Sequence, residues 1–478
     1  MNPREFPRHC SRACLCRSQA HVIVRHLCLA LSAATLQATS LAQASSTTQP
    51  RQVPAKQVPA RHVPALDERL ATAQADAILA RGLNSRGHVT VTKVSRSEMA
   101  TLVNGPAADD DERADSLEIS DEDARNFLLS LRTLTPREGR PPAEHGATET
   151  LAAQASGLYV PSKKTLFVVD EGSGAADGSV LLHEFVHALQ DEHFDLGPKL
   201  REDARGLDAL NARHAFVEGD ATLAVLLDAN LMDPIDESFL KAFTKGLVTA
   251  NRKNAGEGVS HAVADSVVSP YVHGTTFVWS LYTHGGWPAV NTAWSRPPAT
   301  TEQLLHPAKY RTREAPIALR GKPLGPEGFT LRSRQTMGEL DVRTWLAAFV
   351  VDDDADRLAS AWGNGVTELY ERPANGASGQ AAFALRVRVR WDHGHTARAT
   401  ETRDRLVYAF TERFGAPITR GGTACFERPN VGPIAFAATQ HELLALAGPS
   451  PLSMQSATSA SATCENLFTW AKRVKAAP

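Results

Sequence analysis

The residues best suited to chemistry in this 478-residue chain lie at positions 179–190, which read SVLLHEFVHALQ. His183 and His187 are four residues apart, a spacing that on an α-helix separates two side chains by about 40° around the axis and about 6 Å along it. Both imidazoles can therefore reach one tetrahedral zinc ion. Glu184 follows His183 at about 100°, so its carboxylate can lie beside the metal without binding it and take a proton from a bound water. The motif predicts a metal-dependent hydrolase.

The residues around the motif predict a buried helix. Apolar side chains cover its other faces, and the Gly197-Pro198 pair that follows predicts its end. The competing interpretation is an ordinary core helix with two hydrogen-bonded histidines and no metal. A third ligand would decide between the two.

His193 is one candidate for the third ligand. It stands ten residues after His183, the spacing of HExxHxxGxxH sites, in which a glycine breaks the helix. Here Gln190 occupies the glycine position, so the helix should continue and turn His193 about 100° away from the other two histidines.

Glu218 is the favoured third ligand. It lies within residues 208–230, whose amphipathic pattern predicts a second helix packed antiparallel to the first. Two histidines and one glutamate, with water in the fourth position, form a well-attested catalytic zinc site. The adjacent Gly219 permits close approach of two helices. The alternative for Glu218 is a glutamate on the surface of a helix.

Three segments together carry a resemblance to a known class: residues 183–191 (HEFVHALQD), 217–221 (VEGDA) and 300–310 (TTEQLLHPAKY). Over about residues 66–370 the chain resembles the gluzincin zinc metallopeptidases, and more narrowly a group of secreted bacterial proteins of this kind. The resemblance implies one zinc ion held by His183, His187 and Glu218, with Glu184 as general base. Many gluzincins place an aspartate four residues after the ligand glutamate to hold a zinc histidine, and here that position is Thr222.

Other side chains could support such a site. A peptidase needs a hydrogen-bond donor for the oxyanion of its tetrahedral intermediate. His306 is the first candidate for this donor, and Tyr271 and Tyr310 are further ones. Residues that could hold the ligand side chains in place are Gln190, His214, Asp220 and Thr222, although Asp220 should point away on a regular helix. For each of these residues, a purely structural hydrogen bond is the alternative.

A β-hairpin is expected just before the motif. Residues 157–160 and 165–170 have strand composition and flank a Pro-Ser-Lys-Lys turn. An extended peptide could pair with an exposed edge of this hairpin, next to the metal. The alternative is that the hairpin only covers the core.

The start of the chain predicts export. Residues 1–28 contain five arginines, 27–41 form an apolar run, and Ala-Gln-Ala follows at 42–44, a pattern typical of a signal peptide over residues 1–44. The run is shorter than about 18 residues and contains polar side chains, so a membrane anchor is disfavoured. Four of the six cysteines lie in this segment. The remaining pair, Cys425 and Cys464, predicts a disulfide in a periplasmic or extracellular protein.

The chain is expected to have α+β structure in two domains. A linker with repeated Val-Pro-Ala occupies residues 45–65. A mainly helical, zincin-like catalytic domain with a small sheet, and with a turn at residues 285–287, is predicted over 66–320. A smaller α+β domain of unknown role follows over 321–478, with a strand at 383–391, a helix at about 396–413 and further strands at 434–446.

These observations favour an exported zinc peptidase that acts on a peptide or protein. The alternatives are a zinc hydrolase of cell-wall amide bonds and a non-catalytic envelope protein that uses zinc for structure or binding. The formal net charge is −2 and the basic residues are dispersed, so nucleic acid is not an expected partner. No stable membrane span is expected, and nothing in the sequence indicates the oligomeric state.

Overall fold

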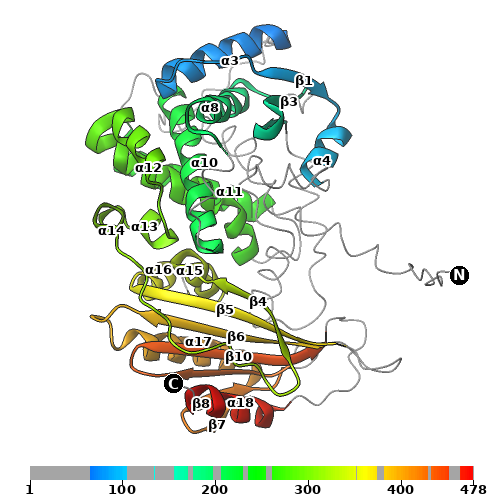
Figure 1. Ribbon diagram of the computed structural model, residues 1–478, viewed down its shortest axis with the longest axis vertical. Helices are drawn as coiled ribbons and strands as arrows, with labels where there is room; N and C mark the ends of the chain where they lie inside the picture. The colour runs from blue at the N-terminus through cyan, green and yellow to red at the C-terminus, as the bar shows by residue number, and fades with distance from the viewer. Residues whose placement is uncertain are drawn as a thin grey trace, which may run out of the picture.

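The structure is a computed structural model. It describes residues 65–104, 134, 156–170, 176–196, 206–229, 235–254, 261–350, 352–373, 382–428, 432–451 and 463–476. The expected signal peptide, nearly all of the linker and the Gly197-Pro198 pair lie outside these residues. Figure 1 shows a helical part and, beside it, a part built on a large sheet, which agrees with the predicted α+β class.

Helix α8 (Gly178–Phe194) contains the HExxH motif. Asp177 begins the helix, because its side chain accepts hydrogen bonds from the backbone N–H groups of Ser179 and Val180. Every residue from Val180 to Asp191 is buried. The helix continues past Gln190, as predicted, and ends at Asp195, which adopts a left-handed conformation with φ 65°.

Helix α10 (Leu207–Ala229) contains Glu218 and lies against both α8 and α12 (His261–Ser295). Gly219 does allow two helices to approach closely, and its partner is α12. A Cβ at Gly219 would lie 2.0 Å from the backbone carbon of Gly274. One at Gly274 would lie 1.8 Å from the carbonyl oxygen of Ala215. The two backbones are therefore in contact, and neither glycine can carry a side chain there.

Helix α12 consists of two helices. Gly285 and Gly286 have non-helical backbone angles, and Gly286 has φ 61°, a conformation that favours glycine. The turn predicted at residues 285–287 is therefore present. Other described helices of this part are α3 (Leu66–Arg81), which packs on α8, α4 (Arg96–Asn104), and α11 (Glu237–Asn254), which packs on α12.

The predicted hairpin is confirmed as β2 (Gly157–Val160) and β3 (Thr165–Val169), joined by a short 3-10 helix at Pro161–Lys163. A third strand, β1 (Thr90–Val94), pairs in parallel with β3 and was not predicted. The strand order β1-β3-β2 leaves β2 at one edge of the sheet.

The second part is a seven-stranded antiparallel sheet with the order β4-β5-β6-β10-β9-β8-β7. The strand bounds are Thr330–Thr336, Trp362–Arg372, Ala382–Trp391, Glu442–Pro451, Ile434–Ala438, Thr423–Phe426 and Ile418–Arg420, in that order. The strand predicted at 383–391 is β6, the helix predicted at 396–413 is α17 (Arg398–Phe414), and the strands predicted at 434–446 are β9 and β10.

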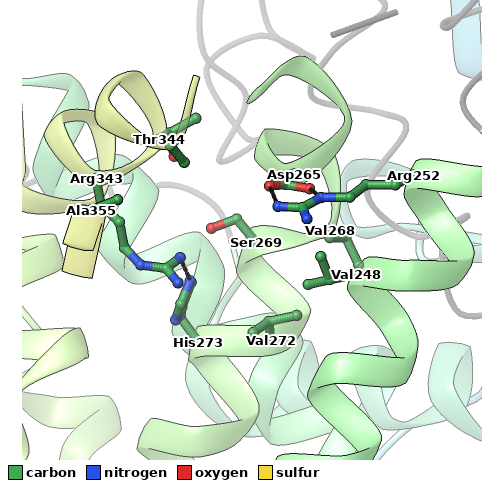
Figure 2. Close-up of a pocket in the computed structure, with 11 residues that line it drawn as sticks. Val248, Arg252, Asp265, Val268, Ser269, Val272, His273, Arg343, Thr344 and Ala355 are labelled. Atoms are coloured by element: carbon green, nitrogen blue, oxygen red, sulfur yellow. Dashed lines mark hydrogen bonds and ion pairs between the residues drawn. The ribbon is translucent and has the colours of Figure 1, made fainter. Parts of the chain in front are cut away.

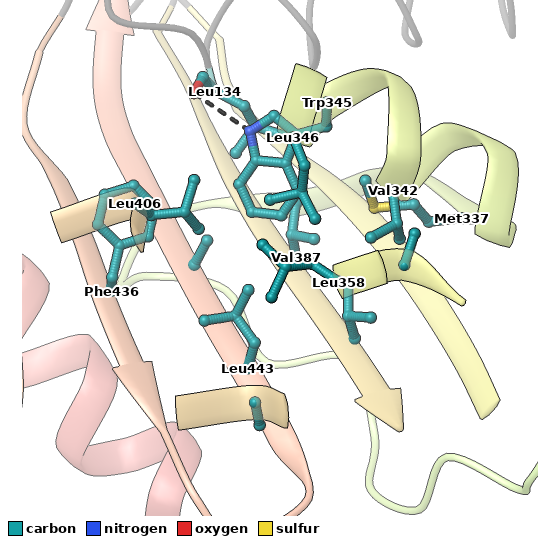
Figure 3. Packing of buried hydrophobic residues seen from close by; sticks show 14 of the residues in the cluster. Leu134, Met337, Val342, Trp345, Leu346, Leu358, Val387, Leu406, Phe436 and Leu443 are labelled. Atoms are coloured by element: carbon teal, nitrogen blue, oxygen red, sulfur yellow. Dashed lines mark hydrogen bonds between the residues drawn. The ribbon is translucent and has the colours of Figure 1, made fainter. Parts of the chain in front are cut away.

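Helices cover both faces of this sheet. Leu406 and Phe410 of α17 pack on one face together with α15 (Glu339–Ala347) and α16 (Asp352–Ala359), in the core shown in Figure 3. Helix α18 (Cys464–Ala476) packs on the other face. The predicted disulfide between Cys425 and Cys464 is present and ties α18 to β8.

Two short helices, α13 (Thr301–Leu305) and α14 (Pro307–Thr312), lie where the helical part meets the sheet part. Thr301 donates hydrogen bonds from its backbone N–H and its hydroxyl to Asp208, at the start of α10. The same hydroxyl accepts the backbone N–H of Leu340 in α15. The segment at residues 300–310 therefore joins the Glu218 helix to the sheet part.

Candidate metal centre

His183 and His187 of α8 meet Glu218 of α10 in the interior of the helical part. The Nε2 atoms of the two histidines are 3.0 Å apart, and Oε2 of Glu218 lies 3.2 Å from His183 Nε2 and 3.5 Å from His187 Nε2. Ligands placed tetrahedrally at about 2.0–2.1 Å from a zinc ion are about 3.3 Å from one another. The three separations match the edges of such a tetrahedron. All three residues are buried, with exposed fractions of 2, 5 and 3%.

Gln190 fixes the orientation of His187. His187 Nδ1 lies 2.8 Å from Oε1 of Gln190, and an amide oxygen can only accept, so Nδ1 is the donor. Gln190 is itself held, because its Nε2 donates to the carbonyl of Val217, next to Glu218. In the neutral imidazole, Nε2 of His187 then carries a lone pair, and this atom faces His183 and Glu218. Lone pairs and a carboxylate directed at one point suit a cation.

His214 holds the other oxygen of Glu218. Its Nε2 lies 3.3 Å from Oε1 of Glu218, one helical turn away. Oε2 is the oxygen that faces His183 and His187. The expectation that His214 supports the site agrees with this contact, and the arrangement leaves one oxygen of Glu218 for a metal.

Glu184 is fully buried, and one of its two carboxylate oxygens is hydrogen-bonded. Its Oε2 accepts the backbone N–H of Tyr159 at 2.7 Å, while no described residue forms a hydrogen bond with its Oε1. Gly157 makes this contact possible: a Cβ there would lie 3.0 Å from Val180 and 3.1 Å from Cγ of Glu184. The edge strand β2 therefore packs directly on the helix of the motif. Burial raises the pKa of Glu184, with the two histidines opposing the shift.

Charge interactions within the group are strong. Burial alone would lower the pKa of His187, but the carboxylates of Glu218 and Glu184 outweigh it and raise that pKa to about 9. For Glu218, burial is outweighed by the three neighbouring histidines, and its pKa lies well below the ordinary value. The site therefore attracts positive charge.

For His193 the structure agrees with the prediction, and for Asp220 and Thr222 it corrects the expectation. His193 turns away, as its position on a continuous helix predicts, and its Nε2 bonds to the carbonyl of Asn84 at 2.7 Å, so it is not the third ligand. Asp220 does not support a histidine of the site: it forms a buried ion pair with Arg81 and accepts a hydrogen bond from Trp294. Thr222 also holds no ligand side chain, because its hydroxyl makes no hydrogen bond to any residue in the described ranges.

In the described part of the chain, no other residue takes this role at His183, and its buried Nδ1 has no hydrogen bond there. A zinc histidine usually donates its other ring N–H to a carboxylate or a carbonyl oxygen. Of the two histidines here, His187 has such an acceptor, the side-chain amide oxygen of Gln190.

The three candidates for oxyanion stabilisation are dispersed. His306 bonds through Nε2 to Glu339 of α15 at 2.7 Å, and Tyr310 donates its hydroxyl to the carbonyl of Arg296. His306 therefore bonds across the junction between the two parts, whereas Tyr310 bonds within the helical part, and both contacts are structural hydrogen bonds. Tyr271 is fully buried, and its ring centre lies 6.2 Å from that of His183. It is the one of the three with a described contact to the site.

Sequence reasoning missed the role of Tyr159. Its backbone N–H binds Glu184, and its hydroxyl donates to Asp191 of α8, which also pairs with Lys164. A backbone donor is independent of residue type, so the sequence contained no signal for the first of these bonds.

A second group of carboxylates, Glu302, Glu314 and Asp392, has oxygens close enough to hold an ion. Here the cation is already part of the chain: the Lys309 ammonium lies 2.5, 2.9 and 2.8 Å from the three carboxylates. This group is therefore an ion-pair cluster of the junction.

Comparisons with protein-family models, with curated proteins and with solved structures find no match to this chain. Within the described part of the chain, no helix has the length and apolar character needed to cross a membrane.

Proposed function

We propose that the protein is a zinc-dependent peptidase of gluzincin type, with one zinc ion held by His183, His187 and Glu218. The observation that carries the proposal is the set of three separations, 3.0, 3.2 and 3.5 Å, between donor atoms that are buried and directed at one point. Glu184 adds what a purely structural site does not need: a fourth buried side chain with one free carboxylate oxygen.

A zinc ion bound there would polarise the scissile carbonyl and lower the pKa of a water molecule. Glu184 then acts as general base: Oε1, which has no other partner among the described residues, accepts the proton from the attacking water and later donates it to the leaving amine. The Tyr159 N–H donates a hydrogen bond to Oε2, so the side chain keeps one orientation while Oε1 transfers the proton. The raised pKa of Glu184 brings its basicity closer to neutral pH.

The substrate we propose is a peptide in extended conformation. β2 is the outer strand of its sheet and lies against Glu184, so a peptide pairing with that edge would pass beside the metal centre. Recognition through backbone groups would tolerate many side chains. The export expected from residues 1–44 would place this activity in the periplasm or outside the cell.

The test compares wild type with Glu184→Gln on casein and on purified cell-wall sacculi. An amide cannot accept the proton, so we expect Glu184→Gln to retain zinc and to lose casein hydrolysis by at least a hundredfold. The control is Glu237→Gln, a change of the same kind on the exposed first turn of α11, which should keep full activity. Full activity in Glu184→Gln would remove it as the base, and release of peptide from sacculi without casein cleavage would favour the cell-wall alternative.

A further inference from the structure

A pocket lies between α11 and α12 of the helical part and α15 and α16 of the sheet part (Figure 2). Its volume is about 80 Å³, several times the roughly 10–15 Å³ that one water molecule needs on the same scale. One wall is aliphatic and consists of Val248, Val268, Val272, Ala347 and Ala355. The metal centre contributes no residue to it.

Arg343 supplies a positive charge to the pocket. Its Nε bonds to Asp356, and its Nη1 donates to Nε2 of His273 at 3.0 Å. Among the described residues Nη2 makes no hydrogen bond, so it can bind a ligand. His273 stays neutral, because burial and the neighbouring guanidinium hold its pKa well below the ordinary value.

Two hydroxyls line the same space. Ser269 is 7% exposed, and its Oγ has no hydrogen-bond partner among the residues that the structure describes. Figure 2 shows this hydroxyl directed toward the space beside the Arg343 guanidinium. A serine within a helix often bonds a carbonyl one turn before it, and a buried hydroxyl without any partner is unfavourable. Thr344 lies across the pocket from the helical part. An unsatisfied buried hydroxyl in a pocket indicates that a ligand completes its hydrogen bonding.

The charges favour an anion. Arg252 and Asp265 form a two-bond ion pair at 2.7 and 2.5 Å and neutralise each other. Arg343 is the other charged residue of the lining, and its partner Asp356 lies outside it. Counted over the lining alone, the net charge is one positive, next to an aliphatic wall. Asp356 binds the Nε edge of Arg343 from outside, so the Nη2 edge is the part of the guanidinium left to contact an anion.

We infer that this pocket binds a small aliphatic carboxylate. The carboxylate contacts Arg343 and the hydroxyls of Ser269 and Thr344, and the aliphatic group packs on the valines. Such a ligand is either a free short-chain acid or the C-terminal residue of a peptide. Arg343 is 29% exposed, so a solute can reach it.

Calorimetric titration of the whole purified chain in EDTA tests this inference independently of any metal. Isobutyrate and N-acetyl-L-alanine represent the two sources, and isobutyramide lacks the charge. We expect saturable binding of at least one carboxylate in the millimolar range and none of the amide. Tighter binding of isobutyrate would identify a free acid, and tighter binding of N-acetyl-L-alanine a peptide terminus. Absence of saturable carboxylate binding, or equal binding of inorganic phosphate, would overturn the proposal.

Ser269→Ala is the decisive variant, because it removes an unpaired hydroxyl and should not lower the Tm. It should weaken carboxylate binding about fivefold. Arg343→Gln should abolish binding, while Arg357→Gln, the same change on α16 outside the lining, should leave it intact. If both variants fold and bind the carboxylate with wild-type affinity, the proposed binding site is refuted.

Discussion

At the scale of single residues, the candidate metal centre is oriented by side chains of its own two helices. Gln190 holds Nδ1 of His187 and bonds to the backbone beside Glu218, so one amide links both helices. His214 holds the outer oxygen of Glu218. Two of the three ligands, His187 and Glu218, are thus oriented by neighbours within one turn of their own helix.

Gln190→Ala tests this orientation. Without its acceptor, the His187 ring can rotate and change tautomer, so we expect zinc affinity to fall at least tenfold. Competition with a chromophoric chelator measures it. His193→Ala, on the same helix, should leave the affinity unchanged, because His193 bonds to Asn84. Unchanged affinity in Gln190→Ala would show that the amide does not orient the ligand.

Geometry could be derived from sequence alone where a single helix determines it. The spacing of His183 and His187 brings them together on any regular helix. The partner of Asp220 could not be predicted in this way, since Arg81 lies 139 residues earlier in the chain. The pairing of His306 with Glu339 likewise depends on how two parts of the fold meet.

At the scale of elements, the contact between α10 and α12 places Glu218. The backbones touch at Gly219 and Gly274, and Glu218 immediately precedes this contact. Any side chain at the crossing would push α10 away from α12 and disturb the position of Glu218 relative to α8.

Gly219→Ala should therefore destabilise the protein by about 3 kcal/mol or more, although alanine is the better helix former. Urea unfolding measures the change, and zinc affinity should fall with it. Gly246→Ala in α11 is the matched control: nothing lies within 4 Å of its added Cβ, so it should stabilise by about 0.5–1 kcal/mol. Equal effects of the two substitutions would contradict the role of the crossing.

Strong patterns made several elements predictable. The apolar periodicity of α8 and α10, the hairpin β2–β3 and the alternation in β6 all correspond to observed elements. Strand β1 was missed because it is five residues long and no residue in it is fully buried. Its position comes from pairing with β3, a contact between segments 75 residues apart.

At the scale of the whole molecule, buried carboxyl groups join the two parts. Asp208 of α10 accepts two hydrogen bonds from Thr301, and a Cβ at Gly338 would lie 1.8 Å from its Oδ1. Asp341 accepts the N–H of Gly338. Burial, with the nearby Asp208, raises the pKa of Asp341 from 3.8 to about 7. The junction therefore contains an acid that folding makes harder to ionise.

This raised pKa predicts a pH dependence of stability. The contribution of Asp341 is fully present below its unfolded pKa of about 4 and is lost as the pH rises through about 7. Asp341→Asn stays neutral and still offers an oxygen to Gly338. We therefore expect it to raise the Tm by a few degrees at pH 8 and by less at pH 5. Differential scanning calorimetry at pH 5 and pH 8 measures the Tm, and Asp353→Asn, at an exposed position, is the control. Equal changes in Tm at the two pH values for Asp341→Asn would contradict the prediction.

The division of the chain at about residue 320 stays a prediction, but the packing is consistent with two cores. The core around α8 and the core under α17 share no residue. Leu134, far earlier in the sequence, belongs to the sheet core, a contact that no local pattern indicates. The disulfide was predictable because only two cysteines follow the expected signal peptide.

The central claim is that His183, His187 and Glu218 hold one metal ion. Elemental mass spectrometry of the purified wild type, Glu218→Ala and His193→Ala, each after reconstitution with zinc and removal of excess, tests it most directly. We expect about one zinc per chain in wild type and His193→Ala, and close to none in Glu218→Ala. Absence of zinc from the wild type, or its full retention in Glu218→Ala, would contradict the metal centre and leave α8 as a core helix with two buried histidines.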